Sequence, residues 1–159
     1  MRTTLVLAAG SALLLGGCSV AHQPSAPSSQ AYIIGTGEIM GENQVRHEKL
    51  WFAGTAGNWP LAQYETSELR EGFDDVKTFH PTFKKKPTAP MIDQYIAGPL
   101  GEVDKAIKDQ SEAEFTTGFN DLTNGCNGCH KEFGMGFNVI QRPTSPPFSN
   151  QNFEPAKTT

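Results

Sequence analysis

Two cysteines and a histidine lie within five residues, in the order Cys126, Asn127, Gly128, Cys129, His130. On a helix, residues three apart lie on the same face, so the two sulfurs point the same way. In this C-x-x-C-H pattern the sulfurs form thioethers to the two vinyl groups of a haem, and the histidine binds the iron. We therefore expect one covalently attached haem c, held by Cys126 and Cys129, with His130 as the proximal axial ligand.

Three other uses of the motif are compatible with its spacing. A disulfide between Cys126 and Cys129 does not require the histidine. A thioredoxin-like redox pair expects a βαβ setting, which the sequence does not suggest. A zinc site needs a fourth ligand, and the chain has no second cysteine pair. We favour haem over these alternatives.

The elements that must position this motif are helices. Apolar residues recur at helical spacing in four stretches, at about 37–53, 58–80, 91–108 and 111–133. Strand signals are nearly absent. Because short connections between amphipathic helices favour antiparallel neighbours, we expect an all-α fold. The expected architecture is an antiparallel four-helix bundle in a domain at 36–133, with the haem on the last helix.

Turn and capping residues indicate where these helices end. Asn58 and Ser111 are suited to the N-cap positions of the second and fourth helices, and Ser111 opens a capping box. Pro81 stops the second helix at the residue before it. Gly98-Pro99 should kink or split the third. Lys84–Pro87 is expected to be a polar loop, either solvated or a docking patch for an acidic partner.

Residues 134–159 form an irregular tail in this scheme, since they contain Pro143, Pro146, Pro147 and Pro155. One alternative is that the tail is disordered. The other is that it packs over the haem domain, because its apolar residues would otherwise be exposed. These are Phe137, Val139, Ile140, Phe148 and Phe153.

The first residues are typical of an export signal. Arg2 gives a positive start, and the apolar run Leu5–Leu15 is too short to span a bilayer. Leu15–Cys18 resembles the lipobox of bacterial lipoproteins, whose peptide is cut before the cysteine. The resemblance implies a signal peptide at 1–17 and a lipid on Cys18. Residues 19–29 are rich in Ser, Ala and Pro and lack periodicity, so we expect a flexible tether at 18–35. An ordinary secretory signal with a chance cysteine is the alternative.

In the resembling lipoproteins a non-acidic residue after the cysteine usually directs the protein to the outer membrane, and here that residue is Ser19. The expected location is therefore the periplasmic side of a membrane, with the lipid as anchor. Several acyl chains give stable anchoring where a single chain is marginal.

The motif's place near the end of the helical domain resembles the cytochrome c-prime family and its relatives, over about 37–133. The segments 46–54 (RHEKLWFAG) and 58–61 (NWPL) look more closely like a group of bacterial monohaem cytochromes of bundle type. The resemblance implies a bundle fold and a single haem, and leaves the biological task poorly defined. It also implies a possible homodimer, although no interface can be identified.

The second axial position decides what such a haem does. In the resembling family the first and last helices flank the haem, and the distal side is open behind an apolar residue. Here His47 lies midway along the first helix on its apolar face, so it is the favoured distal ligand opposite His130. The alternative is a core histidine bonded to a carboxylate or a haem propionate. Met40 and His80 are further candidates.

Charged and aromatic residues near His47 have two interpretations each. Arg46 and Lys49 either pair with haem propionates or are solvated surface charges. Trp51 and Trp59 either pack on the porphyrin or belong to the ordinary core.

Two protein ligands close the iron and suit electron transfer, whereas an open site binds NO or CO. We expect one-electron transfer between redox partner proteins of the respiratory chain, with gas binding as the alternative. A structural subunit in which haem serves as a folding core is a third possibility. No peroxidase-type acid–base pair can be placed, so an enzyme is not expected.

Composition agrees with this interpretation. The chain has 159 residues, with 13 Lys+Arg against 17 Asp+Glu and a net charge of −4, so we expect no nucleic-acid partner. Only 37% of the residues are apolar, and a buried porphyrin would add to the core.

Overall fold

The computed structural model describes residues 32–157. The chain divides into two units, 1–32 and 33–159, and the description below is of the second. The expected signal peptide, Cys18 and most of the tether lie outside the described residues. No helix within 32–157 is long and apolar enough to cross a membrane.

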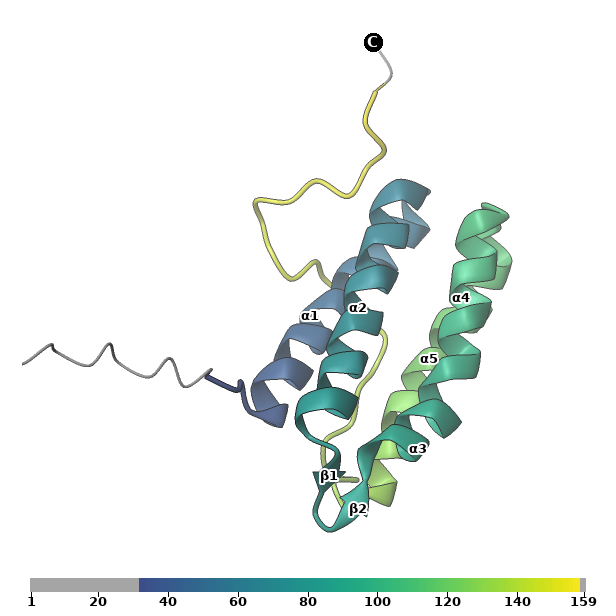
Figure 1. The fold of residues 1–159 in the computed structure, drawn as a ribbon. Coiled ribbons are helices and arrows are strands. Elements are labelled where there is room, and N and C mark those ends of the chain that lie inside the picture. Colours follow the sequence, from purple (N-terminus) through teal and green to yellow (C-terminus); the bar gives the residue numbers. More distant parts are fainter. Residues whose placement is uncertain (1–31, 158–159) are drawn as a thin grey trace, which may run out of the picture. The chain divides into compact units, whose positions relative to one another are not determined.

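The described chain is mainly helical, as the sequence predicts, with one small hairpin (Figure 1). The elements in chain order are α1 (Thr36–Thr55), α2 (Trp59–Phe79), β1 (Thr82–Phe83), β2 (Lys86–Pro87), α3 (Thr88–Ile92), the π-helical turn η1 (Asp93–Ala97), α4 (Gly98–Lys108) and α5 (Glu112–Glu132).

The predicted helix starts are confirmed by their caps. The Asn58 side-chain oxygen accepts a hydrogen bond from the backbone N–H of Leu61 at 3.3 Å, so α2 starts at the next residue. The Ser111 hydroxyl accepts from the backbone N–H of Glu114 at 3.4 Å and caps α5. Each cap satisfies a backbone donor that has no partner inside the helix.

Helix pairs bring distant parts of the sequence together. α1 packs along α2, α4 packs along α5, and the contacts of α2 with α4 and of α1 with α5 join the two pairs (Figure 1). The large side chains between them are fully buried. They include Leu50, Leu100, Phe115, Phe119 and Leu122.

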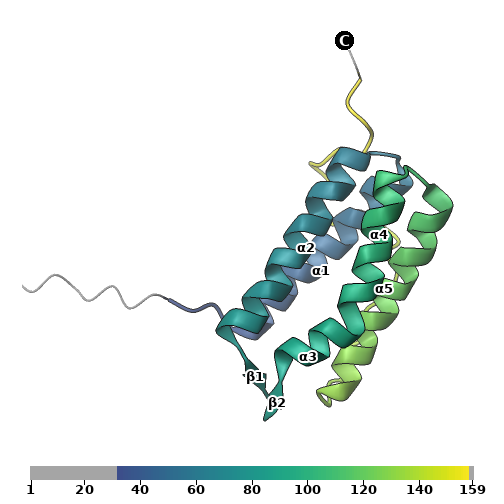
Figure 2. The ribbon, with the colours of Figure 1, turned by 45° about the vertical axis from the view of Figure 1, so that its right-hand side comes forward.

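The expected interruption at Gly98-Pro99 takes the form of the π-helical turn η1. Pro99 has no N–H, so it cannot bond to the carbonyl of Tyr95 one helical turn earlier. The wider turn accommodates this loss, and α3 leads at an angle into α4 (Figure 2).

Two glycines of α5 let η1 approach the C-x-x-C-H motif closely. A Cβ added to Gly125 would lie 2.2 Å from the backbone oxygen of Tyr95, and one on Gly128 would lie 2.7 Å from the Tyr95 ring. Both distances are below any normal contact between such atoms. The glycine inside the motif and the one just before it therefore determine how closely these helices pack.

The prediction of a polar loop at Lys84–Pro87 was incomplete. Strands β1 and β2 pair in antiparallel register, Thr82 with Pro87 and Phe83 with Lys86. Lys84 and Lys85 form the two-residue turn with φ of 46° and 65°. Two-residue hairpin turns require this left-handed conformation, which is normally supplied by Asn-Gly. Two lysines there give no sequence signal for a hairpin.

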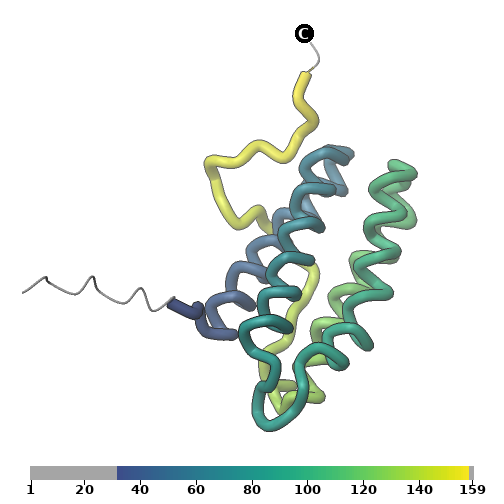
Figure 3. The backbone as a smooth tube through the Cα atoms, in the orientation of Figure 1, coloured from purple at the N-terminus to yellow at the C-terminus, as the bar shows by residue number. Residues whose placement is uncertain are grey.

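The tail has no helix or strand through residue 157, as expected, and it packs on the helices. It turns back after α5 (Figure 3). Its Phe153 is buried, with its ring 5.6 Å from that of Phe52 on α1. The side chain of Asn58 donates to the carbonyl of Glu154 at 3.1 Å. The tail therefore packs on the helices at these points, but Phe137, Val139 and Phe148, which such packing was expected to cover, are exposed.

Candidate functional site

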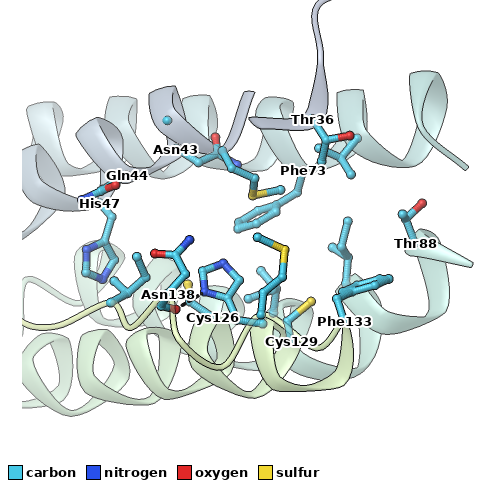
Figure 4. A pocket seen from close by; sticks show the side chains of 18 of the residues that line it. Thr36, Asn43, Gln44, His47, Phe73, Thr88, Cys126, Cys129, Phe133 and Asn138 are labelled. Carbon is cyan, nitrogen blue, oxygen red and sulfur yellow. Dashed lines mark hydrogen bonds between the residues drawn. The ribbon is translucent and has the colours of Figure 1, made fainter. Parts of the chain in front are cut away.

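A cavity of about 260 Å³ gathers the motif and residues from the first helix. Side chains of α1, α2, α3, η1, α5 and the start of the tail line it. Cys126, Cys129 and His130 of α5 line it together with Met40 and His47 of α1. Figure 4 shows Cys126, Cys129 and His47 around the cavity. Most of the remaining lining is apolar, so a bound group would be shielded from water over much of its surface.

Cys126 and Cys129 are free thiols on one face of α5. Burial raises the pKa of the Cys126 thiol to about 12. Burial and the nearby carboxylate of Glu132 also raise the pKa of the Cys129 thiol. Both cysteines are therefore protonated at neutral pH. A redox-active or zinc-binding cysteine works as a thiolate, so this setting does not favour those uses.

The ring of His130 has a defined proton position. Its Nδ1 lies 2.7 Å from the backbone oxygen of Asn138. A carbonyl oxygen only accepts hydrogen bonds, so Nδ1 must be the donor. In the neutral ring the lone pair is then on Nε2. This is the arrangement in which a histidine binds a metal through Nε2 while a backbone carbonyl orients the ring.

His47 is buried, with 3% of its surface exposed, and its ring lies against that of Phe119 with centroids 4.3 Å apart. Its Nε2 lies 2.8 Å from the hydroxyl oxygen of Thr123. The Thr123 hydroxyl donates its own proton to the carbonyl of Phe119 at 2.8 Å. His47 Nε2 must therefore be the donor to Thr123.

Burial also lowers the pKa of His47 to about 4, so the ring is neutral at pH 7. With the proton on Nε2, its lone pair is on Nδ1. His47 thus lines the cavity but engages Nε2 with a hydroxyl, where the sequence suggested a carboxylate or a propionate as the partner of a core histidine. Its role as an iron ligand stays a prediction.

Of the other candidate ligands, Met40 lines the cavity and His80 does not. His80 lies at the end of α2, where its Nε2 donates to the backbone oxygen of Ile34 at 2.7 Å. Met135, which the sequence places close to His130, also lines the cavity. The cavity is therefore lined by two methionines and two histidines, which are Met40, Met135, His47 and His130.

The flanking residues have ordinary structural contacts. Arg46 pairs with Glu68 at 2.8 Å. The ammonium of Lys49 lies 5.4 Å from the ring centre of Phe148 in the tail. The rings of Trp51 and Trp59 lie 6.3 and 6.1 Å from that of Phe115, in the core. None of these four residues lines the cavity.

Sequence reasoning missed three polar residues at the site. Asn138 orients His130, and Thr123 engages His47. Asn43 lines the cavity with 6% of its surface exposed, and its Nδ2 has no hydrogen-bond partner. Asn43 was detectable, because it lies four residues before His47 on the same helical face.

Among residues 32–157, no three His, Cys, Asp or Glu side chains are grouped so as to hold a metal ion by themselves. No protein-family model, curated protein or solved structure matches the chain.

Proposed function

We propose that this chain is a monohaem c-type cytochrome with a four-helix bundle, and that it transfers single electrons. One observation supports this above all. Two protonated thiols and a histidine with its lone pair on Nε2 meet at a single, largely apolar cavity. The cavity volume of about 260 Å³ is slightly below the usual range for small-molecule sites, about 300–1,000 Å³.

The residues at the cavity suit a haem c. The S–H bonds of Cys126 and Cys129 would add across the two vinyl groups, each sulfur bonding one vinyl carbon while its hydrogen goes to the other. This addition needs no oxidant, and it uses thiols in their protonated form. His130 would offer Nε2 to the iron. The bound haem supplies a reversible one-electron couple between ferric and ferrous iron.

The chain's own residues would tune that couple. Apolar lining residues such as Phe73, Leu122 and Phe133 exclude water, which disfavours the more highly charged ferric form. The bond from His130 Nδ1 to Asn138 makes the imidazole a stronger ligand and favours ferric iron. These two effects oppose one another, so the potential depends on both.

Covalent attachment is tested by producing the full-length chain in a bacterium that matures c-type cytochromes. After denaturation, haem should stay on the wild type and on His80→Ala, whose side chain lies away from the cavity. It should be absent from the double variant Cys126→Ala, Cys129→Ala. A wild type that retains no haem after denaturation would contradict the proposal.

Gas binding is a second candidate function, because of the bond between His47 Nε2 and Thr123. Ligation through Nε2 requires His47 to leave Thr123, at a cost of about 1 kcal/mol for a hydrogen bond. If His47 stays, the iron has an open side for NO or CO. Electron transfer is the function we favour, with His47 as the distal ligand.

Absorption spectra of the reduced protein with and without CO separate the two functions. A low-spin spectrum that CO does not change supports electron transfer. If His47 is the ligand, His47→Ala should then become high-spin and bind CO, whereas His80→Ala should behave as wild type. A wild type that is high-spin and binds CO supports gas binding instead.

We also propose that the protein is held on the periplasmic side of a membrane by a lipid on Cys18, near its redox partner proteins. Tethering raises the effective concentration of a carrier near membrane-bound partners. Labelling with a radioactive fatty acid should mark the wild type and not Cys18→Ser. Equal labelling of both would refute the anchor.

A further inference from the structure

Asn127, the residue between the two cysteines of the motif, holds a distant piece of backbone at two points. Its Nδ2 donates to the carbonyl of Ile140 at 2.8 Å. The backbone N–H of Ile140 donates to its Oδ1, also at 2.8 Å. A side-chain amide has both a donor and an acceptor, so it can pair with a peptide as a neighbouring strand does. Two such bonds fix the orientation of Ile140 as well as its position.

The same short stretch provides the partner of His130. Asn138, two residues before Ile140, accepts the bond from His130 Nδ1 at 2.7 Å. Asn127 and His130 are three residues apart on α5, so they lie on one face of the helix. Two neighbouring side chains of α5 therefore hold one segment, residues 138–140, against that face.

This segment lacks the support of regular structure. It belongs to no helix or strand, and Asn138 is joined to the preceding turn by its N–H, which donates to the carbonyl of Met135 at 2.9 Å. Further along, Arg142 donates to the side-chain oxygen of Asn120 at 2.7 Å, and its guanidinium lies 4.6 Å from the ring centre of Trp51. Between these two attachments, the paired bonds of Asn127 hold the backbone in place.

We infer that Asn127 is a positioning residue for the proximal ligand. By holding Ile140, it keeps the carbonyl of Asn138 on the Nδ1 proton of His130. That bond keeps the proton on Nδ1 and leaves Nε2 as the basic nitrogen. The inference rests on the proposed function wherever it concerns iron, and on the contacts alone wherever it concerns the ring of His130.

The consequence for a bound haem is a change in redox potential. An imidazole whose Nδ1–H donates to a carbonyl is a stronger electron donor through Nε2, which stabilises ferric iron. Without Asn127 the carbonyl of Asn138 is no longer held on the Nδ1 proton of His130, so His130 donates less electron density through Nε2. The ferrous form is then more stable relative to the ferric form. We expect Asn127→Ala to shift the equilibrium toward reduced iron several-fold, where a tenfold shift is 59 mV for one electron.

Potentiometry on the haem-loaded full-length protein measures this shift. Asn124→Ala is the matched control, because Asn124 is an exposed asparagine on the preceding turn of α5. Asn127→Gln keeps the amide on a longer side chain and should recover part of the wild-type potential. A potential of Asn127→Ala within error of Asn124→Ala would overturn the inference.

Nitrogen NMR of the haem-free full-length chain tests the same contact without iron. The His130 ring of the wild type and of Asn124→Ala should hold its proton on Nδ1, whereas Asn127→Ala should show a mixture of the two neutral tautomers. A single Nδ1–H tautomer in Asn127→Ala would refute the positioning role. A wild type that never takes up haem would refute the proposed function and leave this result standing.

Discussion

Replacing Gly125 by alanine should destabilise the protein, although alanine is the better helix former. Alanine in place of glycine inside a helix contributes about 0.5–1 kcal/mol of stability when nothing obstructs it. At Gly125 the new Cβ would lie 2.2 Å from the backbone oxygen of Tyr95. Because that atom belongs to the backbone of η1, no side-chain rotation removes the clash.

The size of the effect follows from that distance. A normal contact requires η1 to move away from α5 by at least about 1 Å, and overpacking of this kind costs about 1–3 kcal/mol. After the gain in helix propensity is subtracted, the free energy of unfolding should fall by about 1–2 kcal/mol. Ile96 of the displaced turn lines the cavity, so the cavity should also lose part of its apolar wall.

Urea unfolding followed by far-ultraviolet circular dichroism measures this difference on the haem-free chain. Gly101→Ala in α4 is the matched control, because a Cβ there meets nothing within 4 Å. That variant should be more stable than the wild type by about 0.5–1 kcal/mol. If Gly125→Ala is as stable as Gly101→Ala, the close packing of η1 on α5 is wrong.

Three further predictions concern other parts of the molecule. Thr123→Val removes the hydroxyl that bonds to His47 Nε2, so His47 should leave the ferric iron of the haem-loaded protein less readily and excess cyanide should replace it more slowly than in the wild type; an unchanged rate would argue against control by this bond. Lys85→Gly relieves a left-handed residue and should raise the free energy of unfolding in urea by about 0.5–1 kcal/mol, with no change if the turn is unstrained. Burial raises the pKa of the Glu65 carboxyl, whose oxygens have no hydrogen-bond partner, so Glu65→Gln should stabilise the protein by about 1 kcal/mol at pH 7. In the unfolded chain the Glu65 carboxyl ionises near its ordinary pKa of 4.5, below its pKa in the folded protein, so it destabilises the fold only above that pH. The stabilisation by Glu65→Gln should therefore vanish toward pH 4.5, and a stabilisation that persists there would contradict its electrostatic origin.

Local signals in the sequence predicted most of the helical structure. The side chains of Asn58 and Ser111 cap their helices through hydrogen bonds to residues three positions later in the sequence. Such local contacts can be predicted without knowing the fold. The interruption before Pro99 was predictable for the same reason, since proline removes a bond to a residue only four positions away. How closely the interrupted segment packs on α5 depends on Gly125 and Gly128 of that other helix.

Contacts between distant residues were not predictable in the same way. His47 and Thr123 are 76 positions apart, and neither residue type indicates the other as its partner. The tail has no periodicity, so nothing in its sequence assigns Asn138 to His130 or Ile140 to Asn127. The residues that the sequence predicts to hold haem line one cavity in the structure. The contacts that orient these residues could be identified only from the structure.

The tail that holds His130 has a thermodynamic consequence of its own. Because it is attached through a few side-chain bonds and the buried Phe153, we expect its local detachment to cost less free energy than unfolding of the helices. If its docking strengthens the iron ligand and favours ferric iron, linkage requires ferric iron to favour docking equally. A protease that cleaves the detached tail would then cut the reduced protein faster than the oxidised one. The oxidation state of the haem would then control how much of the time the tail is exposed at the protein surface.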